Sequence, residues 1–191
     1  YKYVLKDNFA VVAVPYRLNK SFTPNTSYYE IHLRKESPIE VELKEWAKEP
    51  YKPIDVYNAV HRVRARRLPD YKKFPNSGSF FKNPVISKEK LGELQSKVDD
   101  LQFYPAEKLE YDDMQSHKED EYVKVALGRL VDELGWRGKV IGNVGSHEKQ
   151  ALFLYTNGNA TGKEVLELSK KIQQDVYENY GIKIHPEVRI V

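Results

Sequence analysis

Residues 161–181, TGKEVLELSKKIQQDVYENYG, are the stretch that most restricts how this chain can fold. Apolar side chains recur there every three or four positions, as on one face of an α-helix: Val165, Leu168, Ile172, Val176 and Tyr180. Thr161 is a suitable amino-terminal cap, and Gly181 can close the helix. The following residues alternate apolar and polar side chains, which is the period of a β-strand. We therefore expect an α+β fold, with helices packed on a small mixed β-sheet.

The alternating tail, IKIHPEVRIV, should separate its side chains onto two faces. The apolar face would carry Ile182, Ile184, Val188 and Ile190, and the polar face Lys183, His185, Glu187 and Arg189. Pro186 restricts the tail to an edge or bulged strand, because proline donates no backbone hydrogen bond. We expect Glu187 to be held on this rigid strand, pointing away from the core between two potential cations.

Three other segments have the helical period. The first, residues 53–68, has Asp55 in its first turn and a cluster of arginines in its last, and Pro69 ends it. Ser87 is a suitable cap for a second helix, and Gly135 can close a third. Their apolar stripes are Val56, Ala59, Val60 and Val63, then Leu91, Leu94, Val98 and Leu101, and finally Leu127, Leu130, Val131 and Leu134.

Two apolar runs, residues 9–18 and 150–158, are predicted to be buried strands, the first of them ending near Pro15. The Gly-rich segment 142–150 is interpreted as a loop. Residues 35–53 are charged and punctuated by prolines, so they are interpreted as a connector with one short element.

A domain boundary is expected at that connector, which separates residues 1–50 from residues 51–191. The chain opens on Tyr1 rather than on a methionine. We expect it to be a piece of a longer protein.

Composition excludes several classes of protein. The 191 residues suffice for one large or two small domains, and 40% of them are hydrophobic, which permits a real core. A net charge of +3 does not demand a nucleic-acid partner. The absence of cysteine excludes disulfides, thiolate zinc sites and cysteine nucleophiles. No apolar run approaches the roughly 20 residues of a membrane span, and no signal peptide is visible, so we expect a soluble, cytoplasmic protein.

The motif NSGSFFKNP, residues 76–84, places two aromatic rings between a serine and an asparagine. On an extended segment Ser79, Phe81 and Asn83 would share one face, and only one of the two phenylalanines need be buried. A polar pair at the rim of an apolar wall is typical of a small-molecule site. The alternative is a strand end whose hydroxyl is satisfied locally.

The end of the first predicted helix is strongly basic, with His61, Arg62, Arg64, Arg66 and Arg67. Cations at this end can simply complement the helix dipole. They could instead bind an anion, because arginine forks match phosphate oxygens. Arg64 and Arg67 are three positions apart and share a helix face.

Several familiar chemistries lack their motifs. Phe81 occupies the place of the second glycine of a Gly-x-Ser-x-Gly elbow, so Ser79 is not a hydrolase nucleophile by motif. The sequence has neither Gly-x-Gly-x-x-Gly nor a phosphate-binding P-loop, and its five histidines show no metal-ligand spacing.

Three separated motifs, NSGSFFKNP, GSHEKQAL and PEVRIV, occur here in a specific order. Together they resemble the C-terminal half of UDP-N-acetylenolpyruvoylglucosamine reductase, a flavoenzyme family of peptidoglycan synthesis. Residues 56–70, 130–138 and 157–182 are also similar to this family, so the resemblance covers nearly all of residues 51–191. The predicted initial strand resembles the end of the family's FAD-binding part, which makes residues 1–50 the end of that domain plus a connector.

The resemblance implies an oxidoreductase that converts UDP-N-acetylglucosamine enolpyruvate to UDP-N-acetylmuramate. In this family NADPH reduces FAD, and the flavin then gives hydride to the vinyl carbon. Ser79 matches the proton donor to the neighbouring carbon, and Glu187 matches an acidic residue that assists protonation. Such chemistry needs donors that stabilise enolate-like charge, and a proton source within hydrogen-bond reach. FAD and NADPH would be bound mostly by the upstream part, so this chain alone is expected to be inactive.

The resemblance also implies contacts with the UDP-sugar. The matching positions are Tyr28, Arg64, Arg67, Asn83, Tyr104, Arg137 and Gln150. The diphosphate gives a physical reason for the arginines. Lys2 stands where the family has an arginine that supports the enolate, and a lysine cannot form the same bidentate fork.

Two non-catalytic alternatives stay open. The chain could bind a UDP-sugar without redox chemistry, or it could bind single-stranded nucleic acid through the arginine-rich helix and neighbouring phenylalanines. The nearly balanced charge and the acidic loop at 110–121 argue against nucleic acid, and no metal and no membrane partner are expected.

Overall fold

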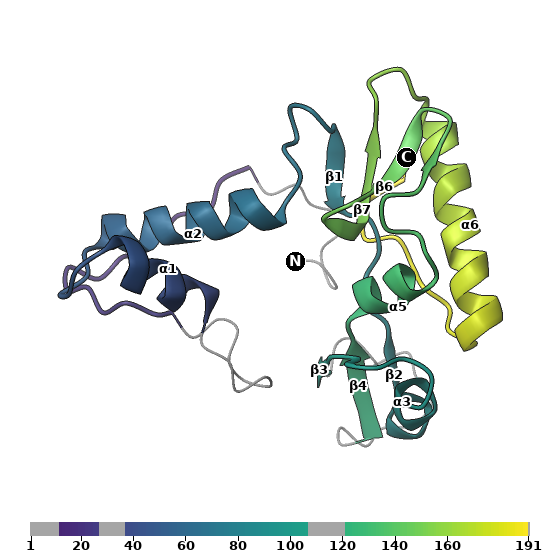
Figure 1. Cartoon of the computed structure of the whole chain (residues 1–191), viewed down its shortest axis with the longest axis horizontal. Helices are drawn as coiled ribbons and strands as arrows, with labels where there is room; N and C mark the ends of the chain where they lie inside the picture. The colour runs from purple at the N-terminus through teal and green to yellow at the C-terminus, as the bar shows by residue number, and fades with distance from the viewer. Residues whose placement is uncertain (1–11, 27–36, 107–120, 191) are drawn as a thin grey trace. The chain divides into compact units, whose positions relative to one another are not determined.

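The computed structural model describes residues 12–26, 37–106 and 121–190 (Figure 1). The chain divides after Arg67 into two compact units, residues 1–67 and 68–191. In the described residues no helix has both the length and the apolar composition needed to cross a membrane.

The first unit is built on a helix pair, α1 (Pro38–Trp46) and α2 (Pro53–Arg67). The prediction of α2 is confirmed, and α1 is the short element expected in the connector. Ser37 caps α1, because its Oγ accepts a hydrogen bond of 3.3 Å from the Ile39 N–H. Leu43 of α1 and Ala59 of α2 are buried where the two helices pack, whereas the predicted valine stripe of α2 is only half-buried.

The predicted strand at 9–18 is wrong where the structure describes it. Residues 12–18 have no regular secondary structure, and their apolar side chains are exposed, with Val12 95% and Leu18 82% accessible. A strand needs a neighbouring strand to pair its backbone groups. The described residues of this unit, 12–26 and 37–67, contain helices only.

The second unit contains a four-stranded antiparallel sheet in the order β1-β7-β6-β5. Its strands are β1 (Asn76–Ser79), β7 (Gln150–Thr156), β6 (Val144–His147) and β5 (Val140–Ile141). The long helix α6 (Gly162–Tyr180) runs along this sheet (Figure 1). Both predicted ends of α6 are confirmed: Thr161 forms a capping box with Glu164, and Gly181 is left-handed with φ of 67°.

A second antiparallel sheet has the order β2-β4-β3. Its strands are β2 (Val85–Ser87), β4 (Tyr122–Val125) and β3 (Phe103–Pro105), and α3 (Lys88–Gln95) packs on it. Helix α5 (Leu127–Glu133) follows β4 and packs on β7, so it joins the two sheets (Figure 1). The α+β class is confirmed, but the expected single mixed sheet is two antiparallel sheets.

One continuous core connects these elements. Its most deeply buried apolar side chains include Phe81, Leu94, Val125, Leu127, Leu130, Leu168, Ile172 and Val176. The stripes predicted for α3, α5 and α6 supply most of them, so the helical periods identified the correct buried faces. The helix predicted after Ser87, whose stripe was expected to reach Leu101, ends earlier at Gln95, although Val98 and Leu101 are still buried.

Two other predictions are corrected. The Gly-rich segment 142–150, expected as a loop, forms β6 and the turn into β7. The tail 182–190 forms no strand: Phe81 and Pro186 make one isolated antiparallel bridge. Pro186 has no N–H to donate, so regular pairing does not extend along the tail. Its alternation still holds where Ile182 and Ile184 are buried and Lys183 and His185 are exposed.

Candidate functional site

Ser79 ends β1 at an irregular point of the sheet. Asn76 pairs with Tyr155 and Ser79 with Phe153, and the register shifts between these two pairs. Gly78 lies inside this irregularity with φ of 82°, a conformation that favours glycine. The Ser79 side chain is exposed at the end of the strand.

Glu187 is brought next to this strand end by main-chain hydrogen bonds. The Glu187 N–H donates to the Phe80 carbonyl at 2.7 Å, and the Lys82 N–H donates to the His185 carbonyl at 2.9 Å. These bonds flank the bridge between Phe81 and Pro186. Glu187 is therefore paired with Phe80, the residue that follows Ser79. The side chains of Ser79 and Glu187 are both exposed.

The two phenylalanines that follow Ser79 belong to the core of the second unit. Phe80 is 6% exposed and Phe81 is 1% exposed. Both are therefore buried, whereas the sequence required the burial of only one. Their rings make an edge contact, with centroids 5.1 Å apart. Strand β1 ends at Ser79, after which the Phe80 N–H donates to the Leu152 carbonyl at 2.8 Å.

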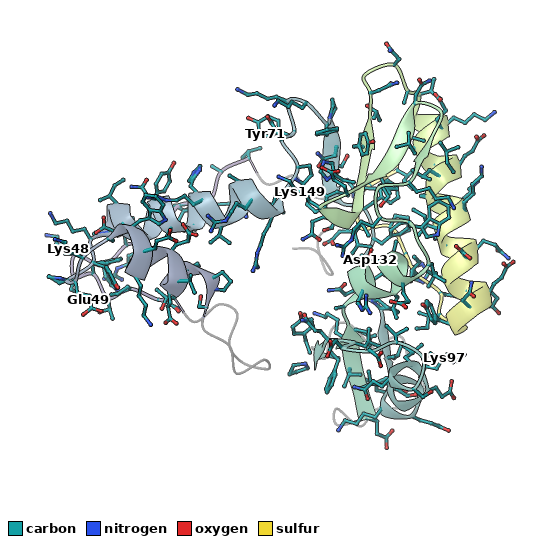
Figure 2. All side chains as sticks on the ribbon, in the orientation of Figure 1. Lys48, Glu49, Tyr71, Lys97, Asp132 and Lys149 are labelled. Carbon is teal, nitrogen blue, oxygen red and sulfur yellow. The ribbon has the colours of Figure 1, made fainter. Side chains whose placement is uncertain are left out.

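Gln150 starts β7 and is half-buried. It pairs with His147 across a tight turn made of Glu148 and Lys149 (Lys149 is labelled in Figure 2). The Lys149 N–H donates to His147 Nδ1 at 3.0 Å, which helps to fix this turn. Because β1 and β7 are antiparallel, the chain beyond Ser79 runs in the direction of Gln150.

His147 is a buried histidine that sequence reasoning did not single out. It is 3% exposed, and its ring makes edge contacts with Phe74 at 4.7 Å and with Tyr155 at 5.7 Å between centroids. Burial lowers its pKa from the ordinary 6.5, and Lys149 lowers it further while Glu148 raises it. The neutral ring keeps Nδ1 available as an acceptor.

Asn83 has a structural partner. Its Oδ1 accepts a hydrogen bond of 3.1 Å from the Leu127 N–H, at the amino end of α5. Ala126 at that end has no capping side chain, so Asn83 acts as a cap that comes from elsewhere in the chain. Its side chain is nevertheless exposed.

Tyr104 and Arg137 lie on other elements. Tyr104 is on β3 of the second sheet, is 37% exposed, and donates from its hydroxyl to Gln102 Oε1 at 3.2 Å. Arg137 follows α5, and its Nη2 is 2.5 Å from Asp132 Oδ2, with Asp132 labelled in Figure 2. An arginine already paired with a carboxylate has less charge to offer an anion.

The arginines of α2 divide between two faces of the helix. Arg62 and Arg66 are four positions apart and both approach the buried carboxylate of Glu42 on α1, which is 2% exposed. Arg64 lies two positions from Arg62, about 200° around the helix, and it shares that opposite face with Arg67. Both Arg64 and Arg67 are exposed. The basic end of α2 therefore combines a structural pair with an outward-facing pair.

Two candidates, Lys2 and Tyr28, lie outside the described residues. Within 12–26, 37–106 and 121–190 no group of three or more acidic or histidine side chains is placed to hold a metal ion. Sequence reasoning missed Glu42 and Asn76. Glu42 stands between apolar residues on α1, and Asn76 lies two residues before a glycine, which is a pattern of Asx turns.

Comparison with known proteins gives a consistent result. Residues 69–191 match the family model described as UDP-N-acetylenolpyruvoylglucosamine reductase, C-terminal domain. A UDP-N-acetylenolpyruvoylglucosamine reductase of Flavobacterium johnsoniae is 39% identical and aligns with 100% of this chain and 51% of its own length. One of Burkholderia vietnamiensis is 37% identical over 95% of this chain and 47% of its own length. The chain thus spans about half the length of the curated relatives that it matches.

Proposed function

Because the chain belongs to the UDP-N-acetylenolpyruvoylglucosamine reductase family, we propose that it forms the substrate-binding half of such a reductase. The complete reductase would reduce UDP-N-acetylglucosamine enolpyruvate to UDP-N-acetylmuramate, and a flavin-binding part would accompany these residues. The main-chain pairing of Glu187 with Phe80, directly beside Ser79, is the observation that best supports the proposal.

In this proposal Ser79 gives a proton to the carbon next to the one that receives hydride. A serine hydroxyl is a weak acid, so it needs a nearby polar group that assists the transfer and stabilises the charge left behind. Glu187 is the nearest acidic candidate along the main-chain pairing. The exposed position of both side chains allows a substrate to reach them.

FAD reduced by NADPH supplies the hydride in this family, and the helix amino ends of the second unit offer few free N–H groups to the diphosphate of either dinucleotide. These ends are already capped by the chain itself: Ser87 at α3, Asn83 at α5, and Thr161 with Glu164 at α6. A capped end has fewer free N–H groups for a diphosphate. We propose that both cofactors bind mostly outside residues 51–191.

The remaining assignments concern the UDP-sugar. Gln150 is the best supported, because the chain beyond Ser79 runs toward it. Arg64 and Arg67 are proposed to bind the diphosphate, since both side chains are exposed on one face of α2 and arginine forks match phosphate oxygens. Further proposed contacts are Tyr28, Asn83, Tyr104 and Arg137, and Lys2 is proposed to support the enolate.

The test replaces Ser79 by alanine in the complete reductase. We expect bleaching of the flavin band by NADPH to proceed at the parent rate, and its return on addition of the UDP-sugar to slow by about 100-fold or more, as is usual when a general acid is lost. Ser77→Ala is the matched control, since Ser77 is the neighbouring exposed serine of β1. Return of the band at the parent rate in Ser79→Ala would show that Ser79 is not the proton donor.

A further inference from the structure

Asn76 makes two hydrogen bonds to the main chain on either side of itself. Its Nδ2 donates to the Phe74 carbonyl at 2.6 Å, and its Oδ1 accepts from the Gly78 N–H at 2.9 Å. A carbonyl can only accept and an N–H can only donate, so this pairing fixes which way the amide group points. Asn76 therefore spans the segment that leads into Ser79.

The segment spanned by Asn76 departs from regular strand geometry. Gly78 has φ of 82°, and the register of β1 on β7 shifts between Asn76 and Ser79. Bulges of this kind change the direction of the side chains that follow them. The bond from the Gly78 N–H holds the bulge, which in turn sets the direction in which Ser79 leaves the strand.

The other end of this arrangement is attached to the core of the sheet. Phe74 packs edge-on against both His147 and Tyr155, with centroids 4.7 Å and 5.1 Å away. The Pro75 carbonyl accepts a hydrogen bond of 3.0 Å from the Thr156 N–H of β7. The Phe74 carbonyl that accepts from Asn76 Nδ2 thus belongs to a segment packed on the sheet. Through its second bond Asn76 attaches Gly78 to that segment.

We infer that Asn76 is a positioning residue for Ser79. The inference rests on the proposed function, because it assigns Asn76 to the reaction through the Ser79 hydroxyl. An amide is required since it offers a donor and an acceptor at once. Aspartate keeps the acceptor for Gly78 but places a second acceptor against the Phe74 carbonyl, and alanine removes both bonds.

The experiment measures both half-reactions of the complete reductase for Asn76→Ala, Asn76→Asp, Ser79→Ala and the control Ser77→Ala. For Asn76→Ala we expect flavin reduction by NADPH to be unchanged and flavin reoxidation by saturating UDP-sugar to slow by about 10–100-fold, the effect of misplacing a reacting group by about 1 Å. Asn76→Asp should be intermediate, and Ser77→Ala should equal the parent. Hydrogen exchange of the Gly78 amide in the same proteins should be faster in Asn76→Ala than in the parent.

The outcomes separate this inference from the proposed function. Reoxidation in Asn76→Ala within about twofold of the parent, with Ser79→Ala strongly impaired, overturns the inference and leaves the role of Ser79 intact. An active Ser79→Ala overturns the role of Ser79, and the inference with it. Equal losses in the two half-reactions of Asn76→Ala indicate a general loss of structure and also overturn the inference. If Asn76→Ala does not fold, Asn76→Asp decides by the same criteria.

Discussion

The buried carboxylate of Glu42 is paired with exposed arginines, so we predict that substituting the arginine and substituting the glutamate will change the stability of the helix pair by different amounts. Glu42 is 2% exposed, whereas its partners Arg62 and Arg66 are 38% and 61% exposed. Arg66 bonds to Glu42 Oε1, while Arg62 Nε is 3.7 Å from Oε2 and neither of those two atoms forms a hydrogen bond in the described structure. The carboxylate is thus buried, and Arg66 supplies its direct hydrogen bond.

Removing the exposed Arg66 should therefore destabilise the first unit more than removing the buried Glu42. Arg66→Gln leaves a buried carboxylate without its direct partner, for which we expect a loss of about 3 kcal/mol in the free energy of unfolding of the first unit. Glu42→Gln leaves a neutral amide that can still accept from Arg66, and the freed arginines can be hydrated. Its cost should be about 1 kcal/mol, the difference between a charge-assisted and a neutral hydrogen bond.

Fluorine NMR with 5-fluorotryptophan measures this in each unit separately. The chain has two tryptophans, Trp46 on α1 and Trp136 in the second unit. Urea titration of the Trp46 resonance reports on the helix pair, and the Trp136 resonance is the internal control. Arg64→Gln is the matched substitution on the opposite face and should change stability by less than about 0.5 kcal/mol. The reasoning is refuted if Arg66→Gln is no more destabilising than Glu42→Gln, or if adding Glu42→Gln to Arg66→Gln restores no stability.

Two further predictions concern the second unit. Gly145→Ala should lower the unfolding free energy of this unit by about 1–3 kcal/mol, because the new Cβ would lie 3.0 Å from Tyr155 Cε1 and 3.1 Å from the Lys139 carbonyl oxygen. Gly92→Ala should raise it by about 0.5–1 kcal/mol, because Gly92 is on an exposed helix face with nothing within 4 Å of the new Cβ. Urea titrations that show the same sign for both substitutions would contradict this. Since burial lowers the pKa of His147 below the 6.5 of the free side chain, the unfolded chain binds the proton more tightly, and unfolding free energy should fall as pH drops through 6.5 toward the lowered folded pKa. His147→Asn, which can accept the same Lys149 N–H, should flatten this pH dependence, and an unchanged slope would show that His147 is not its source.

The sequence predicted helices better than strands, for a physical reason. The caps of α6 and the Ser87 cap of α3 are local signals, because a helix makes its hydrogen bonds within one segment. A strand depends on partners that are distant in the sequence. For this reason the short strand β4 was not predicted, and a strand was predicted over residues 12–18, where the structure has none.

The candidate site shows the same division. The motifs gave Ser79 and Glu187 as candidates, and the tail's alternation correctly predicted that Glu187 is exposed. The alternation could not show that the tail attaches to residues 80–82 by main-chain bonds, since that register depends on the folded sheet. Likewise, the capping of α5 by Asn83 joins residues far apart in the sequence, and no local pattern predicts it.

The buried pair Phe80 and Phe81 connects the core to the main chain of the candidate site. The same residues that fill the core also provide the main chain from which Ser79 departs and to which Glu187 attaches. A substitution that creates space in the core at either position should displace this shared main chain, so under the proposed function it should reduce both thermal stability and the rate of the step assigned to Ser79. Directed evolution that selects for one property at these positions will be selecting for the other as well.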